Sequence, residues 1–317
     1  IIAMMLISAG CLGNNDDEKE AEDIQSNIPL TGCMDITAIN YDENATISDG
    51  DSCEFPDDPA DDLLSIPHRD GCDNTNPIHC MLPFPSDAFL VDDDSTNTGK
   101  RISYSANTIP SSGTVSQINL PIINQIDGAS PNTQIMTAFD TDPDVSQMAG
   151  QYSIEKSLET GHPSMIINQN TGELIPHWTE IDIRSDESEP SIIHLRTIKA
   201  LDHNTSYVIL FTDLKDSDDN YIVAPVGFAA LRDNVITNSP DIEDRRTDFQ
   251  ELFIWIEENT DRSISSLQTA WVFNTASTES IIGPLLSMRN DALERIGENG
   301  IGCTVESNEE VLDEDGN

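Results

Sequence analysis

The run "SYVILFTDL" (residues 206–214) decides the fold class of this 317-residue chain. It is short, rich in β-branched and aromatic residues, and it ends in turn-forming residues, a combination that is typical of a β-strand. The following "DLKDSDDNYI" (213–222) predicts a turn, whose acidic residues either shape the backbone or bind a cation. The centre of the chain is therefore expected to be built from strands.

Three further segments show the same short apolar or alternating pattern. They are "QIMTAF" (134–139), "PSMIINQNTGELIPHWTEIDIR" (163–184) and "SIIHLRT" (191–197). The second contains "NQNTGE" (168–173), which predicts a hairpin turn. Several strands at this spacing, with no helical period between them, favour an immunoglobulin-like (Ig-like) β-sandwich.

The pattern changes after residue 234. Phe249, Leu252, Phe253 and Ile256 follow the spacing i, i+3, i+4, i+7, which predicts an amphipathic helix. "LQTAWVFNT" (267–275) predicts a buried strand. A second helix is expected to begin at an N-cap, Ser277, and to pack through one apolar stripe: Ile281, Leu285, Met288, Ala292 and Ile296. Trp255, Trp271 and Met288 are assigned to the core. The predicted fold is mainly β with a smaller α part.

Charge restricts the class of partner. The chain carries 58 acidic and 15 basic residues, a formal charge of −43. Nucleic acid is excluded as a partner because a polyanion would be repelled by this surface. Acidic residues concentrate at 14–23 and 306–317, which predicts a solvated linker and a tail.

The first residues predict export. "IIAMMLISAGC" (1–11) is apolar for about ten residues, which suits a signal-peptide core and is too short to span a bilayer. Small residues before Cys11 resemble a lipobox, which implies a lipid on Cys11 and anchoring at the extracellular face of the cell envelope. The alternative is an ordinary secretory signal. Either reading takes the chain out of the cytoplasm.

Export makes disulfides the expected state of the cysteines. Local pairing predicts Cys33–Cys53 and Cys72–Cys80, and it leaves Cys303 to a partner beyond residue 317. "CDNTNPIHC" (72–80) lacks the two closely spaced ligand pairs of a structural zinc site, and the chain has no C-x-x-C redox motif. We therefore expect a disulfide-closed loop, after which Pro83 and Pro85 hold the chain extended while Phe84 and Phe89 enter a core.

Residues 32–55, "GCMDITAINYDENATISDGDSCEF", resemble a short disulfide repeat of secreted proteins. One bridge would stabilise a module that is too small for its own core. The module's acidic and amide side chains either bind Ca²⁺ or only form turns. The candidate calcium ligands are Asp35, Asp42, Asn44, Asp49 and Asp51. No other cofactor is expected.

Five phrases occur in the order found in a group of secreted proteins: "CMLPFPSDAF" (80–89), "NTGELIPHWTEID" (170–182), "YVILFTDLKDSDDNYIVAPVGFAALRD" (207–233), "TAWVFNTAS" (269–277) and "SMRNDAL" (287–293). They resemble the N-terminal region of lipoproteins of the bacterial virulence-factor lipase type. The resemblance implies Ig-like strands that precede an α/β-hydrolase domain.

The chain itself shows no catalytic motif. "GASPN" (128–132) is the nearest approach to G-x-S-x-G, but Pro131 and Asn132 replace the last two positions and no helix pattern follows. The six histidines form no visible nucleophile–base set. We therefore expect no catalytic residue and a non-catalytic N-terminal part of a surface lipoprotein hydrolase. The alternative is a self-contained binding or adhesion lipoprotein.

The expected organisation follows these breaks in composition. In order, it comprises a signal and lipobox (1–11), an acidic linker (12–31), the disulfide module (32–55), a linker (56–71), the β-rich Ig-like domain (72–234), a helix–strand–helix segment packed on it (235–303) and an acidic tail (304–317).

Overall fold

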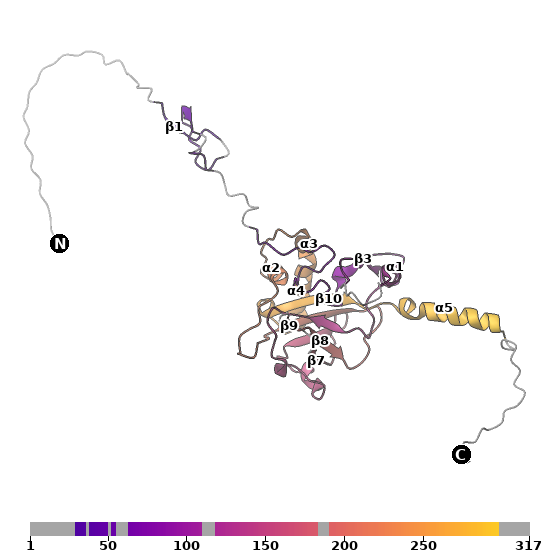
Figure 1. Cartoon of the computed structure of the whole chain (residues 1–317). Helices are drawn as coiled ribbons and strands as arrows, with labels where there is room; N and C mark the ends of the chain where they lie inside the picture. Colours follow the sequence, from indigo (N-terminus) through magenta and orange to yellow (C-terminus); the bar gives the residue numbers. More distant parts are fainter. Residues whose placement is uncertain are drawn as a thin grey trace, which may run out of the picture. The chain divides into compact units, whose positions relative to one another are not determined.

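The computed structural model describes residues 29–35, 38–49, 52–54, 63–109, 118–182 and 190–297. The chain divides into two compact units, Ile1–Asp61 and Asp62–Asn317. Figure 1 traces the elements of both along the sequence. The expected signal, the anchor at Cys11, Cys303 and the C-terminal tail lie outside the described residues.

The first unit is the disulfide module. Strand β1 (Thr31–Gly32) pairs in parallel with β2 (Ile47–Ser48), and the expected disulfide joins Cys33 to Cys53. Among its described residues, the buried apolar ones are Cys33, Ala38 and Ala45. Such a small apolar centre depends on the covalent bridge for its stability.

The second unit contains two three-stranded sheets. In the first, β9 (Ser206–Thr212) lies between β10 (Leu267–Asn274) and β6 (Ser164–Asn168); in the second, β8 (Ile193–Thr197) lies between β5 (Ile135–Thr137) and β7 (His177–Ile181). All of these pairs are antiparallel. A separate hairpin joins β3 (Leu90–Asp92) to β4 (Lys100–Ile102). The fold is mainly β, as the sequence predicts.

Strand β9 is central because both of its faces are buried. Tyr207, Ile209 and Phe211 belong to one apolar cluster, and Val208 and Leu210 belong to another. Side chains alternate between the two faces of a strand, so a strand buried on both faces is apolar throughout. This is the physical reason for the unbroken run "YVILF".

The first cluster lies between the two sheets. Phe211 stacks on Trp271 of β10 with ring centroids 6.4 Å apart, and Ile193 and Leu195 of β8 enter the same cluster. Four of the larger cluster members are no more than 1% exposed: Trp271, Tyr207, Phe211 and Phe273. The two sheets therefore share one core.

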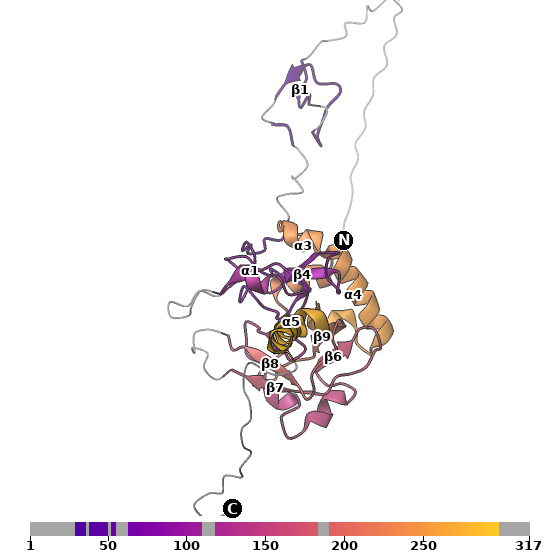
Figure 2. The same ribbon diagram turned by 90° about the vertical axis from the view of Figure 1, so that its right-hand side faces the viewer.

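Helices cover the opposite face of β9 and β10. They are α2 (Val226–Arg232), α3 (Pro240–Asp244) and α4 (Arg246–Asn259). The buried side of α4 consists of the four residues that its period predicts, Phe249, Leu252, Phe253 and Ile256. Figures 1 and 2 show these helices on one side of β9 and the strands β7 and β8 on the other. The remaining short helices are α1 (Leu120–Ile123), η2 (Asp87–Phe89), η3 (Val145–Gln147), η4 (Ile154–Leu158) and η5 (Ile264–Ser266).

The predicted turn at residues 168–173 forms, but its two strands belong to different sheets. The backbone N–H of Asn168 donates to Glu173 at 2.9 Å, and that of Ile175 donates to Ile166 at 2.8 Å. Pro176 follows and has no N–H with which to extend this ladder. The chain then enters the other sheet as β7, which pairs with β8 instead of β6.

The second expected disulfide, Cys72–Cys80, is present. The first half of the loop that it closes is buried in the second unit. The N–H of Phe228 in α2 donates to the carbonyl of Thr75 at 2.9 Å. Gly227 allows this approach, because a Cβ at that position would lie 2.1 Å from the carbonyl oxygen of Asn74. The four polar loop residues are at most 3% exposed: Asp73, Asn74, Thr75 and Asn76.

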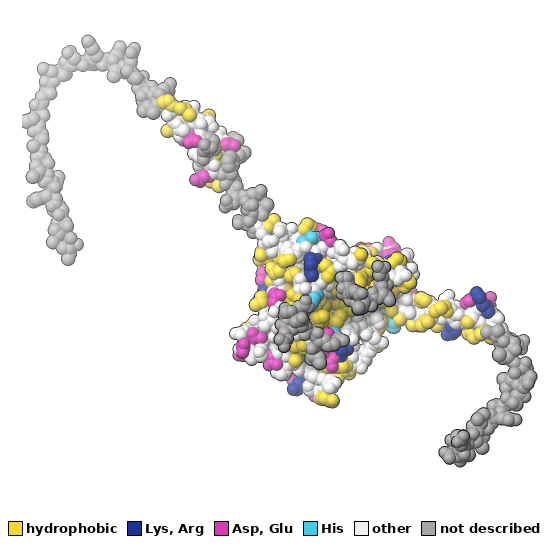
Figure 3. Space-filling model, in the orientation of Figure 1, with side chains coloured by type: hydrophobic (Ala, Val, Ile, Leu, Met, Phe, Trp, Pro, Cys, Tyr) yellow, Lys and Arg dark blue, Asp and Glu magenta, His cyan; other side chains and the backbone are white. Residues whose placement is uncertain are grey.

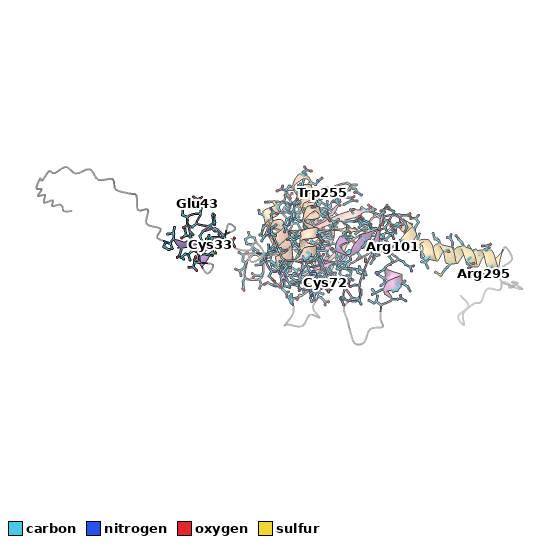
Figure 4. The ribbon with its side chains drawn as sticks, turned by 90° about the horizontal axis from the view of Figure 1, so that it is seen from above. Cys33, Glu43, Cys72, Arg101, Trp255 and Arg295 are labelled. Carbon is cyan, nitrogen blue, oxygen red and sulfur yellow. A yellow bond between two sulfur atoms is a disulfide. The ribbon has the colours of Figure 1, made fainter. Side chains whose placement is uncertain are left out.

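The last helix, α5 (Thr278–Ile296), begins at the predicted N-cap, where the Ser277 hydroxyl accepts a hydrogen bond from the N–H of Ser280. The stripe expected to pack on the β domain is not buried: α5 has no buried residue, and Met288 is 61% exposed. Figure 3 shows hydrophobic side chains along it, and Figure 4 shows Arg101 of β4 near its base and Arg295 at its far end. Among the described helices, none combines the length and the apolar character needed to cross a membrane.

Candidate ligand-binding site

A cavity of about 280 Å³ lies in the second unit, between the small hairpin, the end of β10 and the base of α5. Its walls come from six stretches of chain and are mainly apolar. The lining includes four aromatic residues and two polar ones: Phe84, Phe89, Tyr104, Phe273, Asp87 and Asn274. Ligand sites are typically concave, largely apolar and equipped with a few polar groups. This cavity fits that description.

The Pro-rich segment that forms one wall is held in place by backbone bonds. Phe84 exchanges two hydrogen bonds with Met136 of β5, at 2.8 and 2.7 Å, and the indole N–H of Trp271 donates to the carbonyl of Pro85 at 2.7 Å. The segment bends around two cis peptide bonds, Leu82–Pro83 and Phe84–Pro85, and does not continue as an extended strand. Phe89 enters the core, as expected, whereas Phe84 is half-buried and faces the cavity.

Asp87 brings a carboxylate into this apolar wall. One of its oxygens accepts the backbone N–H of Asn274 at 2.9 Å, and the other accepts the side-chain amide of the same residue. Burial raises the pKa of Asp87 to about 6, although the charge of Lys100 and the bonds from Asn274 oppose the shift. At neutral pH the group is therefore mostly ionised.

Tyr104 also lines the cavity, next to Phe89. Its backbone is fixed by Asn124, whose amide donates to the Tyr104 carbonyl at 2.8 Å and whose oxygen accepts the Tyr104 N–H at 3.1 Å. Its ring centroid is 5.6 Å from that of Phe89. Burial raises the pKa of Tyr104 to about 12, so its hydroxyl stays protonated.

The "GASPN" segment forms another wall and is a loop, as expected. The N–H of Ala129 donates to the carbonyl of Asn274 at 2.8 Å, and the carbonyl of Ala129 accepts the N–H of Ala276 at 2.7 Å. A Cβ on Gly128 would lie 2.7 Å from the backbone nitrogen of Ala276, so only glycine allows this approach. Ser130 lines the cavity, but its hydroxyl accepts the N–H of Asn132, and the described lining residues include no histidine.

A serine–histidine contact that sequence reasoning missed lies elsewhere. The Ser164 hydroxyl of β6 donates to Nε2 of His177 in β7 at 2.9 Å, and Nδ1 of His177 donates to the Ile175 carbonyl at 2.9 Å. Both residues are 0% exposed. Burial lowers the pKa of His177 to about 4. A substrate has no access to this pair, which therefore fills a structural role.

The candidate calcium ligands lie partly outside the described residues. Asp51 is not described, and the Asp42 carboxylate accepts the N–H of Asn44 at 2.9 Å, as a turn-forming side chain does. Within the described ranges, three or more His, Cys, Asp or Glu side chains converge on no potential metal position. Calcium binding at the module stays a prediction.

The cavity could not be located from one segment of sequence. Asp87 lies in "PFPSDAF", where an acid between two phenylalanines is a faint signal of a polar group in an apolar wall. Its partner Asn274 is 187 residues away. Comparison with known proteins adds no assignment: no family model, curated protein or solved structure matches this chain.

Proposed function

We propose that the chain is the non-catalytic N-terminal region of an exported esterase- or lipase-type hydrolase. In this proposal a lipid on Cys11 anchors it to the membrane at the extracellular face of the cell envelope, and a hydrolase domain of the same protein is its partner. The cavity beside Asp87 binds a small apolar ligand or the apolar part of a substrate.

One observation carries the proposal: two of the phrases that resemble the lipase-type lipoproteins meet in the cavity. "CMLPFPSDAF" supplies Phe84 and Asp87, and "TAWVFNTAS" supplies Phe273 and Asn274. The two phrases are far apart in sequence and are joined by the Asp87–Asn274 hydrogen bonds. Shared phrases that line one cavity favour a shared binding role.

Two features support the proposed location outside the cytoplasm and the proposed rigid frame for binding. Disulfides at Cys33–Cys53 and Cys72–Cys80 suit an oxidising compartment outside the cytoplasm. The two facing sheets with a common core support an Ig-like β-sandwich, an architecture that holds binding loops on a rigid frame.

A second candidate is a self-contained binding lipoprotein. It is favoured by the cavity itself, because the described residues that line it all belong to the second unit, Asp62–Asn317. The genomic reading frame separates the two candidates. A hydrolase-length extension with G-x-S-x-G after Asn317 is expected, whereas a stop codon there would leave the second candidate.

Two experiments on the whole chain test the proposal. Short p-nitrophenyl esters should not be hydrolysed, and turnover that disappears on Ser130→Ala would contradict the non-catalytic assignment. Benzyl alcohol should bind, as measured by calorimetry, and Ala129→Leu should weaken it by filling the cavity. The matched control is Ala88→Leu, an exposed neighbour of Asp87 that does not line the cavity.

A further inference from the structure

We infer that the cavity selects a small apolar amine, held in its protonated form with Asp87 as the counter-ion. This inference rests on the proposed binding role of the cavity and adds the chemical class of the ligand. Four features point to a cation: a carboxylate in the lining, aromatic walls, no basic side chain among the described lining residues, and the charge of the whole chain.

The first feature is the carboxylate of Asp87. Among the described residues that line the cavity, Asp87 is the one with a charged side chain. Asn274 supplies two of the roughly four hydrogen bonds that a carboxylate can accept. A buried charge in an apolar wall is costly unless an opposite charge compensates it. A ligand cation in the cavity would supply that compensation.

Two protein cations influence Asp87 but form their ion pairs with other acids. Lys100 and Arg245 both act on the charge of Asp87 through space. Lys100, however, pairs with Asp92 at 3.4 Å, and Arg245 pairs with Asp73 at 2.6 Å. Neither forms an ion pair with Asp87 in the described part of the chain, and neither lines the cavity. Asp87 therefore has no direct ion-pair partner among the described residues, and a ligand cation can take that position.

The aromatic lining is the second feature. Four aromatic residues contribute to the walls around Asp87: Phe84, Phe89, Tyr104 and Phe273. Aromatic faces attract ammonium groups, and the carboxylate supplies the opposite charge. The same rings accept the apolar body of the molecule.

The size of the cavity and the net charge of the chain also favour a small cation. A cavity of about 280 Å³ lies at the small end of ligand pockets, which run from roughly 300 to 1,000 Å³, so it suits one ring or a short chain. The formal charge of −43 concentrates cations near the surface and repels anions. A fatty-acid carboxylate would meet Asp87 with no basic residue in the lining to offset the repulsion.

The test uses three probes of one shape on the full chain at neutral pH: benzylamine, benzyl alcohol and benzoate. Calorimetry on the unmodified protein should show benzylamine binding at least about tenfold more tightly than benzyl alcohol, with benzoate weakest. Asp87→Asn should remove this preference, so that benzylamine binds no more tightly than benzyl alcohol. Asp218→Asn, the same change at an exposed turn, should alter neither.

The outcomes separate this inference from the proposed function. If benzylamine and benzyl alcohol bind with equal affinity, and Asp87→Asn changes neither, the ligand is not selected as a cation. The proposed binding of apolar molecules would then still stand. Binding of none of the three probes would overturn both. Binding of benzyl alcohol by Asp87→Asn would show that the cavity of the variant is formed. If the variant does not fold, the comparison of the three probes on the unmodified protein still tests the inference.

Discussion

Asp73 and Arg245, 172 residues apart in sequence, form an ion pair at 2.6 Å that joins the Cys72–Cys80 loop to the start of α4. The Asp73 side chain is 0% exposed. Its carboxylate also accepts hydrogen bonds from the hydroxyl and the backbone N–H of Thr75, at 2.6 and 3.1 Å, and from the hydroxyl of Ser86, at 3.0 Å. The buried loop thus presents a carboxylate that requires its partner.

Arg245→Met tests this dependence. The change leaves Asp73 buried without a cation, so we expect a loss of roughly 3 kcal/mol in the free energy of unfolding, measured by urea denaturation. The control is Arg246→Met, whose guanidinium pairs with the more exposed Glu243 at 2.7 Å, and about 1 kcal/mol is expected there. Equal losses in the two variants would show that the buried pair is not special.

The two disulfides should differ in what they stabilise. Replacing Cys72 and Cys80 with serine opens a loop of sequence separation 8, and chain entropy alone predicts a loss of about 2 to 3 kcal/mol in the second unit. The same change at Cys33 and Cys53 affects the first compact unit and should leave the main unfolding transition in place. A large shift of that transition in the Cys33/Cys53 variant would contradict this assignment.

Gly227→Ala should be destabilising because the new methyl group would lie 2.1 Å from a backbone oxygen that cannot rotate away. Overpacking of this kind costs roughly 1 to 3 kcal/mol. Gly283→Ala in α5 is the matched control, since its methyl group would meet nothing within 4 Å, and alanine favours a helix by about 1 kcal/mol. Circular dichroism during thermal unfolding measures both. An unchanged Gly227→Ala variant would mean that the loop can move aside.

The parts of the fold that depend on local periodicity could be predicted from sequence. The apolar run of β9 and the four buried residues of α4 are examples, because each pattern directly reports which faces are buried. The exit of the chain from β6 into the other sheet at Pro176 could not be predicted. A turn signal reports the reversal of the chain but not the strand that pairs next.

The candidate site was less predictable for a related reason. Its walls come from six stretches of chain, and a pattern within any one stretch carries no information about the others. The stripe on α5 shows the opposite limitation: its period predicts a helix correctly, but period alone does not say what covers the apolar side. Composition predicts a polar loop at 73–76, whereas the structure buries it because its polar groups are hydrogen-bonded.

Cys11→Ser tests the proposed anchor. In a bacterial host, the unmodified chain should label with a radioactive fatty acid and sediment with membranes, because a lipid on the new N-terminal cysteine holds it there. The Cys11→Ser variant should not label. Cys303→Ser is the control and should label as the unmodified chain does. Secretion of an unlabelled unmodified chain would favour the ordinary secretory signal instead.

The acid response of stability should depend on two buried groups of opposite effect. His177 has a pKa of about 4 in the folded protein, against about 6.5 when unfolded. The unfolded chain therefore binds more protons between these values, so the contribution of His177 is complete above about pH 6.5 and is lost as the pH falls toward 4. The full contribution of His177 to the free energy of unfolding is about 3 kcal/mol.

Asp87 acts in the other direction. Its pKa is raised to about 6 in the folded state from the ordinary 3.8, so the folded chain binds more protons in this range and its contribution to stability grows as the pH falls through 6. His177→Gln should consequently lose less stability than the unmodified protein between neutral pH and about pH 4, and Asp87→Asn should lose more. Urea denaturation at each pH measures the differences. Because the other titrating groups are common to all three proteins, parallel pH profiles would show that neither burial affects proton binding.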